Sequence, residues 1–76
     1  MQFEIGRVFE DHRTKGRQNA AGDLVFNVRW SDPDGTGHIW KARHKTRAVI
    51  DELHAAYVEA NELGSIRLLH GNPVLP

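Results

Sequence analysis

Residues 24–45, LVFNVRWSDPDGTGHIWKARHK, decide the fold. In the first part of this stretch, apolar residues hold every second position: Leu24, Phe26, Val28 and Trp30. Successive side chains of a strand point to opposite faces, so this period of two predicts a strand over 24–31. The four apolar side chains are expected on its core face.

The stretch Asp32-Pro33-Asp34-Gly35 predicts a tight turn after this strand. Proline presets φ for the second turn position, aspartate hydrogen-bonds locally, and Gly35 takes the positive φ that closes a hairpin. The chain should therefore double back into a second strand over 38–44. Basic residues hold one parity of this segment: Lys41, Arg43 and Lys45. We expect these three cations on one side of the sheet and Trp40 on the other.

Two further elements flank the hairpin. Residues 3–10 mix apolar and polar side chains, which predicts a strand with the imperfect alternation typical of a bulge. Apolar residues recur every three or four positions over 47–62, which predicts an amphipathic helix between a capping Thr46 and Gly64. Four side chains are expected to pack this helix on the sheet: Val49, Ile50, Leu53 and Tyr57.

Together these elements predict one α+β domain over residues 1–64 and a C-terminal tail over 65–76. The expected architecture is a curved, three-stranded antiparallel sheet with one C-terminal helix packed on it. In the tail, Ile66–Leu69 is expected to add a short extended piece before Gly71, Asn72 and Pro73 turn the chain away.

Length and composition favour a binding module over an enzyme. A chain of 76 residues buries too little surface for a deep catalytic pocket, and the absence of cysteine excludes disulfides and thiolate zinc sites. The five histidines form no HxxH or HExxH motif and no i, i+4 pair. We therefore expect no catalytic residue, no metal and no small-molecule cofactor. Without a long apolar run or a leader, we expect neither a membrane segment nor secretion.

Charge is balanced overall but unevenly distributed along the chain. Ten basic and ten acidic side chains give a formal net charge of zero. Residues 1–50 nevertheless carry nine of the basic groups and six of the acidic ones. Such a separation steers a polyanion or a basic tail to one side of a molecule, and it is equally typical of a helix with an acidic first half.

Several motifs together resemble a chromodomain: FEI at residues 3–5, VFEDHR at 8–13, KGR at 15–17, FNVRW at 26–30, and Trp40 before a final helix. The resemblance covers residues 3–62 and implies a chromo-like or SH3-like partial barrel. It also implies a histone-tail peptide bound by strand addition near residues 3–7. By position, Phe3 and Trp30 match two walls of the cage that holds methyl-lysine, and Pro33 stands near the third. Chromodomains of integrating elements have similarly incomplete cages.

Residues 26–57 are also similar to the arm-type DNA-binding domain of tyrosine integrases. The similarity rests on VRWSDPDG, HIWKARHKT and the helix that follows, and it implies a sheet laid in the major groove of duplex DNA. The implied contact set is basic: Arg29, Lys41, Arg43 and Lys45.

We therefore expect a module that docks on chromatin or DNA, for example as the targeting part of an integrating element. The alternatives are an arm-type DNA binder and a small phage or bacterial protein whose sheet edge binds another protein. The expected compartment is nuclear for a eukaryotic chromodomain and cytoplasmic otherwise. Two plainer interpretations stay open: Trp30 also continues the core parity of its strand, and the cations also fit a solvated strand face.

Overall fold

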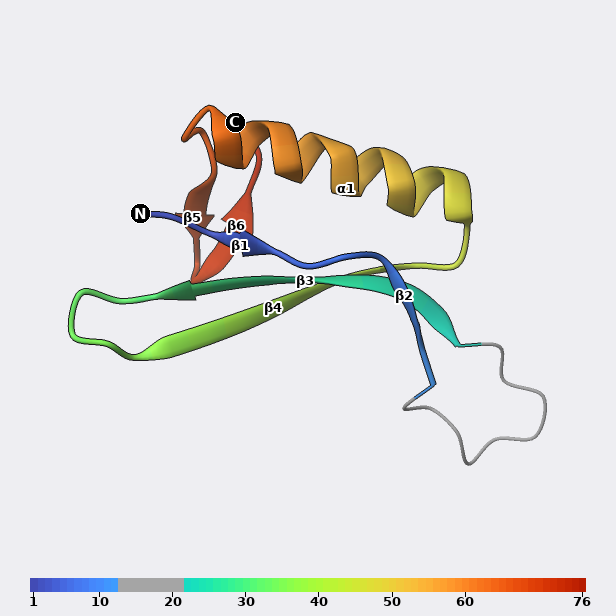
Figure 1. Ribbon diagram of the computed structural model, residues 1–76, viewed down its shortest axis with the longest axis horizontal. Coiled ribbons are helices and arrows are strands. Elements are labelled where there is room, and N and C mark those ends of the chain that lie inside the picture. The colour runs from blue at the N-terminus through green and yellow to red at the C-terminus, as the bar shows by residue number, and fades with distance from the viewer. Residues whose placement is uncertain (13–21) are drawn as a thin grey trace.

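The computed structural model describes residues 1–12 and 22–76, so the predicted turn at 15–17 and Arg13 lie outside the described residues. One antiparallel sheet contains β1 (Glu4–Ile5), β2 (Phe9–Asp11), β3 (Asp23–Ser31) and β4 (Gly37–His44). Helix α1 (Arg47–Glu62) lies along one face of this sheet (Figure 1). A second sheet, made of β5 (Arg67–Leu69) and β6 (Asn72–Val74), lies beside the C-terminal end of α1.

The α+β class and the single packed helix are confirmed, but the prediction of three strands in the sheet was wrong. β1 and β2 pair with the same side of β3: Ile5 faces Val28, and Phe9 faces Val25. The three residues 6–8 therefore lie opposite only two residues of β3. One extra residue on one strand is a β-bulge, which bends the strand and interrupts its pairing. The expected first strand is consequently two short strands.

The predicted hairpin between β3 and β4 forms at the expected turn. Gly35 has a φ of 93°, and its N–H donates to the carbonyl oxygen of Asp32 at 2.9 Å. A turn followed by a left-handed glycine is a common three-residue hairpin loop. β4 then pairs with β3 along its whole length, from Ser31 opposite Gly37 to Leu24 opposite His44.

Helix α1 begins and ends where the sequence predicts. Thr46 occupies the N-cap position, but its side chain makes no capping hydrogen bond, so that detail of the prediction was wrong. The Thr46 N–H instead donates to Nδ1 of His44 at 3.0 Å. At the other end, Gly64 has a φ of 67° and the Ser65 N–H donates to the Ala60 carbonyl at 2.8 Å. This bond is the signature of a Schellman motif, which satisfies carbonyl groups left open at a helix end.

The core lies between α1 and the four-stranded sheet. Its fully buried apolar side chains come from β3 and α1: Phe26, Val28 and Ile50. Tyr57 packs on Phe26 with ring centroids 5.7 Å apart, and on Trp40 at 5.6 Å. Val49, which we expected on the packed face of the helix, is instead 42% exposed.

The C-terminal residues, expected to form an extended piece and a turn, form the β5–β6 hairpin. His70 and Gly71 both have positive φ, at 52° and 81°, as the two-residue type I′ turn requires. The Tyr57 hydroxyl donates to the Pro73 carbonyl oxygen at 3.0 Å. This buried hydrogen bond ties the hairpin to the middle of α1.

Candidate nucleic-acid interface

The face of the four-stranded sheet that α1 leaves uncovered, the helix-free face, carries every second residue of each strand. The strand register arranges its side chains in rows across the sheet: Glu4, Arg29 and Ile39; Asn27 and Lys41; Phe9, Val25 and Arg43. Trp40 has the opposite parity and packs on Tyr57 of α1. Lys41 and Arg43 therefore lie on the other side of the sheet from Trp40, as the alternation predicts.

Three of the four predicted cations share the helix-free face. Arg29 is exposed and Lys41 is half-buried, and neither forms an ion pair with another residue of the described part of the chain. Arg43 lies beside the buried carboxylate of Asp11, with Nη2 3.3 Å from Oδ2. Lys45 follows the last residue of β4 and so stands outside the row.

Two adjoining hollows mark the helix-free face. The larger has a volume of about 950 Å³, and its lining includes the Glu4, Arg29 and Ile39 row. The smaller, of about 440 Å³, is lined partly by Asn27 and shares Glu4 and Arg29 with the larger one. Arg29 therefore stands where the two hollows meet.

Sequence reasoning did not assign Arg7, which lines the smaller hollow and is exposed. Residue 7 lies in the bulge between β1 and β2, where the alternation of side chains is interrupted. The parity that located Arg29 and Lys41 therefore gives no signal for it.

Phe3 and Trp30, the predicted peptide slot, lie together at the end of the sheet. Their ring centroids are 5.8 Å apart, and His38 stacks on Trp30 at 5.3 Å with an interplanar angle of 16°. All three residues line the larger hollow. However, Phe3 is only 4% exposed and Trp30 only 7%. The two rings contribute mainly to the core and offer little free surface to a ligand.

The edge of the sheet formed by β1 and the bulge, the first-strand edge, is covered by α1. The side-chain amide of Asn61 accepts from the Phe3 N–H at 3.2 Å and donates to the Phe3 carbonyl at 2.7 Å. Nε2 of His54 lies 2.8 Å from the Gly6 carbonyl oxygen, to which it donates. A peptide added at residues 3–7 would have to displace these side chains, which argues against strand addition at that edge.

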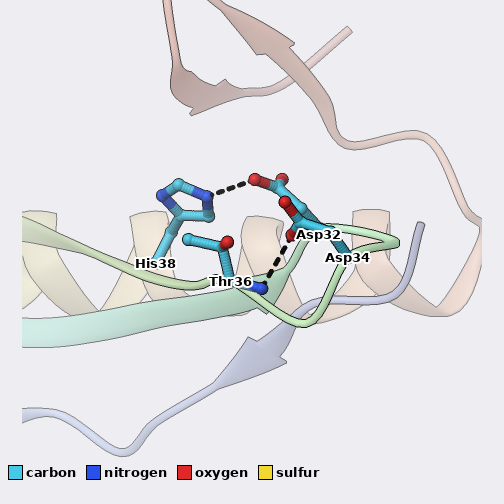
Figure 2. A network of polar contacts seen from close by, with 4 residues as sticks. All are labelled: Asp32, Asp34, Thr36 and His38. Carbon is cyan, nitrogen blue, oxygen red and sulfur yellow. Dashed lines mark hydrogen bonds and ion pairs between the residues drawn. The ribbon is translucent and has the colours of Figure 1, made fainter.

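The turn between β3 and β4 holds a polar network beside Trp30, and His38 belongs both to this network and to the lining of the larger hollow. The Thr36 N–H donates to Oδ1 of Asp34 at 2.9 Å, and His38 Nε2 lies 2.7 Å from Oδ2 of Asp32 (Figure 2). The hydrogen bond that the Thr36 backbone donates lowers the pKa of Asp34, and a second, smaller contribution comes from the Thr36 side chain. These contacts fix the turn that positions the start of β4.

Other kinds of site find little support in the described residues. Within residues 1–12 and 22–76, no three His, Cys, Asp or Glu side chains gather closely enough to hold a metal ion. The single helix of this part of the chain is not long and apolar enough to cross a membrane. Comparison of the chain with family models, curated proteins and solved structures found no match.

Proposed function

We propose that this protein is a small, non-enzymatic binding module that docks on duplex DNA through its helix-free face. One observation carries the proposal: Arg29, Lys41 and Arg43 occupy successive rows of the side of the sheet that α1 does not cover. Arginine and lysine side chains neutralise phosphates and reach the edges of bases. The similarity of residues 26–57 to arm-type DNA-binding domains supports the same use of this face.

The width of the sheet suits the major groove. Neighbouring strands lie about 4.8 Å apart, so three strand positions span roughly 10 Å. The major groove of B-form DNA is about 12 Å wide and admits a β-ribbon. In this arrangement Arg29 on the central strand reaches toward base edges, while Lys41 and Arg43 on the outer strand meet phosphates.

Acidic side chains on the same face limit the affinity. Glu4 lies opposite Arg29, and Asp11 already holds Arg43. With two or three phosphate contacts, the logarithm of the binding constant should fall by about 2 to 3 for each tenfold rise in salt. A protein with so few contacts and no net charge should bind DNA weakly and mainly at low salt.

Fluorescence anisotropy of a labelled duplex oligonucleotide, titrated with the protein across a salt series, tests this proposal. Lys41→Ala should weaken binding by about three- to tenfold at low salt and reduce the salt slope by about 1. Arg29→Ala should weaken it at least as much, and unequally between sequences, because Arg29 lies on the central strand.

Arg67→Ala is the matched control, because it removes one exposed cation from β5 in the second sheet. It should leave binding within about twofold of the parent protein. Equal losses in the Arg67 and Lys41 variants, or no binding to duplex DNA even at low salt, would contradict the proposal.

A second candidate function is histone-tail recognition by a chromo-like partial barrel. The observation in its favour is that Phe3 and Trp30 line the larger hollow. A cage holds a methylated ammonium group through exposed ring faces, and these two rings expose little. The same anisotropy experiment with lysine-methylated and unmodified histone peptides decides the point: equal affinities remove the cage from consideration.

A further inference from the structure

β4 pairs with β3 on one side only, and we call its other side the β4 edge. Along this edge the backbone N–H and C=O groups of alternate residues point away from the sheet. The carbonyl oxygen of Asn27 accepts from the Gly6 N–H at 2.8 Å, so Asn27 directs its backbone toward the first strand and away from β4. Lys41 faces Asn27 across the sheet. In an antiparallel ladder such a pair exchanges no hydrogen bonds, so the N–H and C=O of Lys41 point outward.

The same alternation extends along the strand. Hydrogen-bonded and non-hydrogen-bonded pairs alternate, so Ile39 and Arg43 also turn their backbone groups outward. The hairpin loop gives an independent check: the Asp32 N–H donates to the Thr36 carbonyl at 2.8 Å, which fixes the same phase. Among the described residues, nothing hydrogen-bonds to the outward groups of Ile39, Lys41 or Arg43.

The side chains of the β4 edge are basic or apolar. Lys41 and Arg43 hold alternate positions, and Arg43 also pairs with Asp11 of β2. Ile39 precedes them with 51% of its surface exposed, and no acidic residue occurs between Gly37 and Lys45. Pairing this edge with the same edge of a second copy, centred on Lys41 or Ala42, would bring cations against cations. Like charges directly across a strand pair destabilise it, so a second copy is a poor occupant.

We propose that the β4 edge binds an extended, acidic segment of a partner protein by strand addition. Backbone hydrogen bonds form with the three outward residues, two acidic side chains at alternate positions lie beside Lys41 and Arg43, and an apolar side chain packs on Ile39. This inference adds the backbone of the β4 edge to two cations of the helix-free face, Lys41 and Arg43, and its test does not depend on DNA binding.

Amide hydrogen exchange followed by NMR tests the proposal, with the synthetic peptide TETETVT, acetylated and amidated at its ends, as the probe. Aligned antiparallel, its two glutamates meet Arg43 and Lys41 and its valine meets Ile39. In the free protein, the amides of Ile39, Lys41 and Arg43 should exchange much faster than those of Trp40 and Ala42. Saturating peptide should slow the three fast amides by at least about tenfold and leave Trp40 and Ala42 unchanged.

A matched pair of variants isolates the backbone contribution. Ile39→Pro and Ile39→Ala both remove the isoleucine side chain, but only proline removes the outward N–H, which an edge strand tolerates. The alanine variant should bind TETETVT about threefold more weakly than the parent protein, and the proline variant at least tenfold more weakly. Circular dichroism checks that both variants keep the fold.

The lysine peptide TKTKTVT, with the same length and apolar residue, should bind at least about tenfold more weakly than TETETVT. Equal binding of the two peptides, or no protection of the three amides by TETETVT, would overturn the proposal. The cations would then act only to keep the edge solvated. Protection of these amides in the free protein, together with a dimeric mass by sedimentation, would mean that a second copy occupies the edge. That result would also overturn the proposal.

Discussion

The two edges of the four-stranded sheet are protected in different ways. At the first-strand edge, Asn61 and His54 of α1 hydrogen-bond to the backbone of Phe3 and Gly6. At the β4 edge, no described residue does the same, and basic side chains stand along the strand instead. Unpaired strand edges invite pairing with other chains, and proteins suppress this by covering an edge or by charging it. This small domain uses both solutions, one on each side.

The two kinds of protection also determine which edge keeps its backbone groups accessible. A covered edge has its backbone groups satisfied within the molecule, whereas a charged edge keeps them in water and selects against partners of the same sign. The edge that the chromodomain resemblance assigns to a peptide is the covered one. The edge that sequence alone did not single out is the open one.

Removing the cover from the first-strand edge should give the largest effect. Asn61→Ala leaves the N–H and C=O of Phe3 without partners, which should lower the free energy of unfolding by about 2–3 kcal/mol. In a domain of this size, that corresponds to a fall in Tm of roughly 10–20 °C. Glu62→Ala, at an exposed neighbouring position, should change the stability little. A similar loss in both variants would mean that Asn61 acts through helix stability and not as a cover.

A smaller effect is expected at the turn that leads into the β4 edge. Gly35→Ala should lower the free energy of unfolding by about 1 kcal/mol, because Gly35 has a φ of 93°. Gly37→Ala is the control: an added Cβ also meets nothing within 4 Å there, and Gly37 has no positive φ. Chemical denaturation of the two variants should therefore separate the conformational cost from any steric one. Equal stabilities would show that the turn relaxes without cost.

The smallest effect concerns the pH dependence of the helix that covers the first-strand edge. Burial raises the pKa of Tyr57, the only tyrosine, above its usual value of 10.0. Below about pH 10 the phenol is neutral in both the folded and the unfolded protein, so its full contribution to stability is present. Above it the unfolded chain loses its proton first, and stability falls as the pH rises through the folded-state pKa. Urea unfolding between about pH 8 and pH 11 should show this decline, and Tyr57→Phe should reduce its slope.

The parts of the fold that local patterns determine were predictable from the sequence. The two-residue period of β3, the turn chemistry of Asp32 to Gly35 and the helical spacing of α1 all act over a few residues. The imperfect alternation of residues 3–10 indicated a bulge, but its position and the division into β1 and β2 were not predictable, because they depend on how residues 6–8 meet β3. The sequence predicted a turn at residues 71–73 but not strand β6, because the turn lies at His70 and Gly71, and His70 adopts a positive φ that is uncommon for a residue other than glycine.

The candidate site was predictable only in part, for a related reason. The alternation of side chains along β4 put Lys41 and Arg43 on the other face of the sheet from Trp40. The alternation along β3 put Trp30 with the core residues, and its burial confirms this. The covering of the first-strand edge could not be predicted, because Asn61 reaches Phe3 across 58 positions of sequence and His54 reaches Gly6 across 48. Which backbone groups of β4 face outward depends on the phase of hydrogen bonding, which side-chain patterns do not reveal.

The contacts of Asn61 and His54 also set an order for folding. The β3–β4 hairpin closes a short loop and forms from local contacts, whereas the first strand gains its partners only when a segment about fifty residues away is already in position. We therefore expect the first strand to dock last and to detach first. If α1 lifted from the sheet, the first-strand edge would lose its cover, and the sheet would then present two unpaired edges where the folded protein presents one.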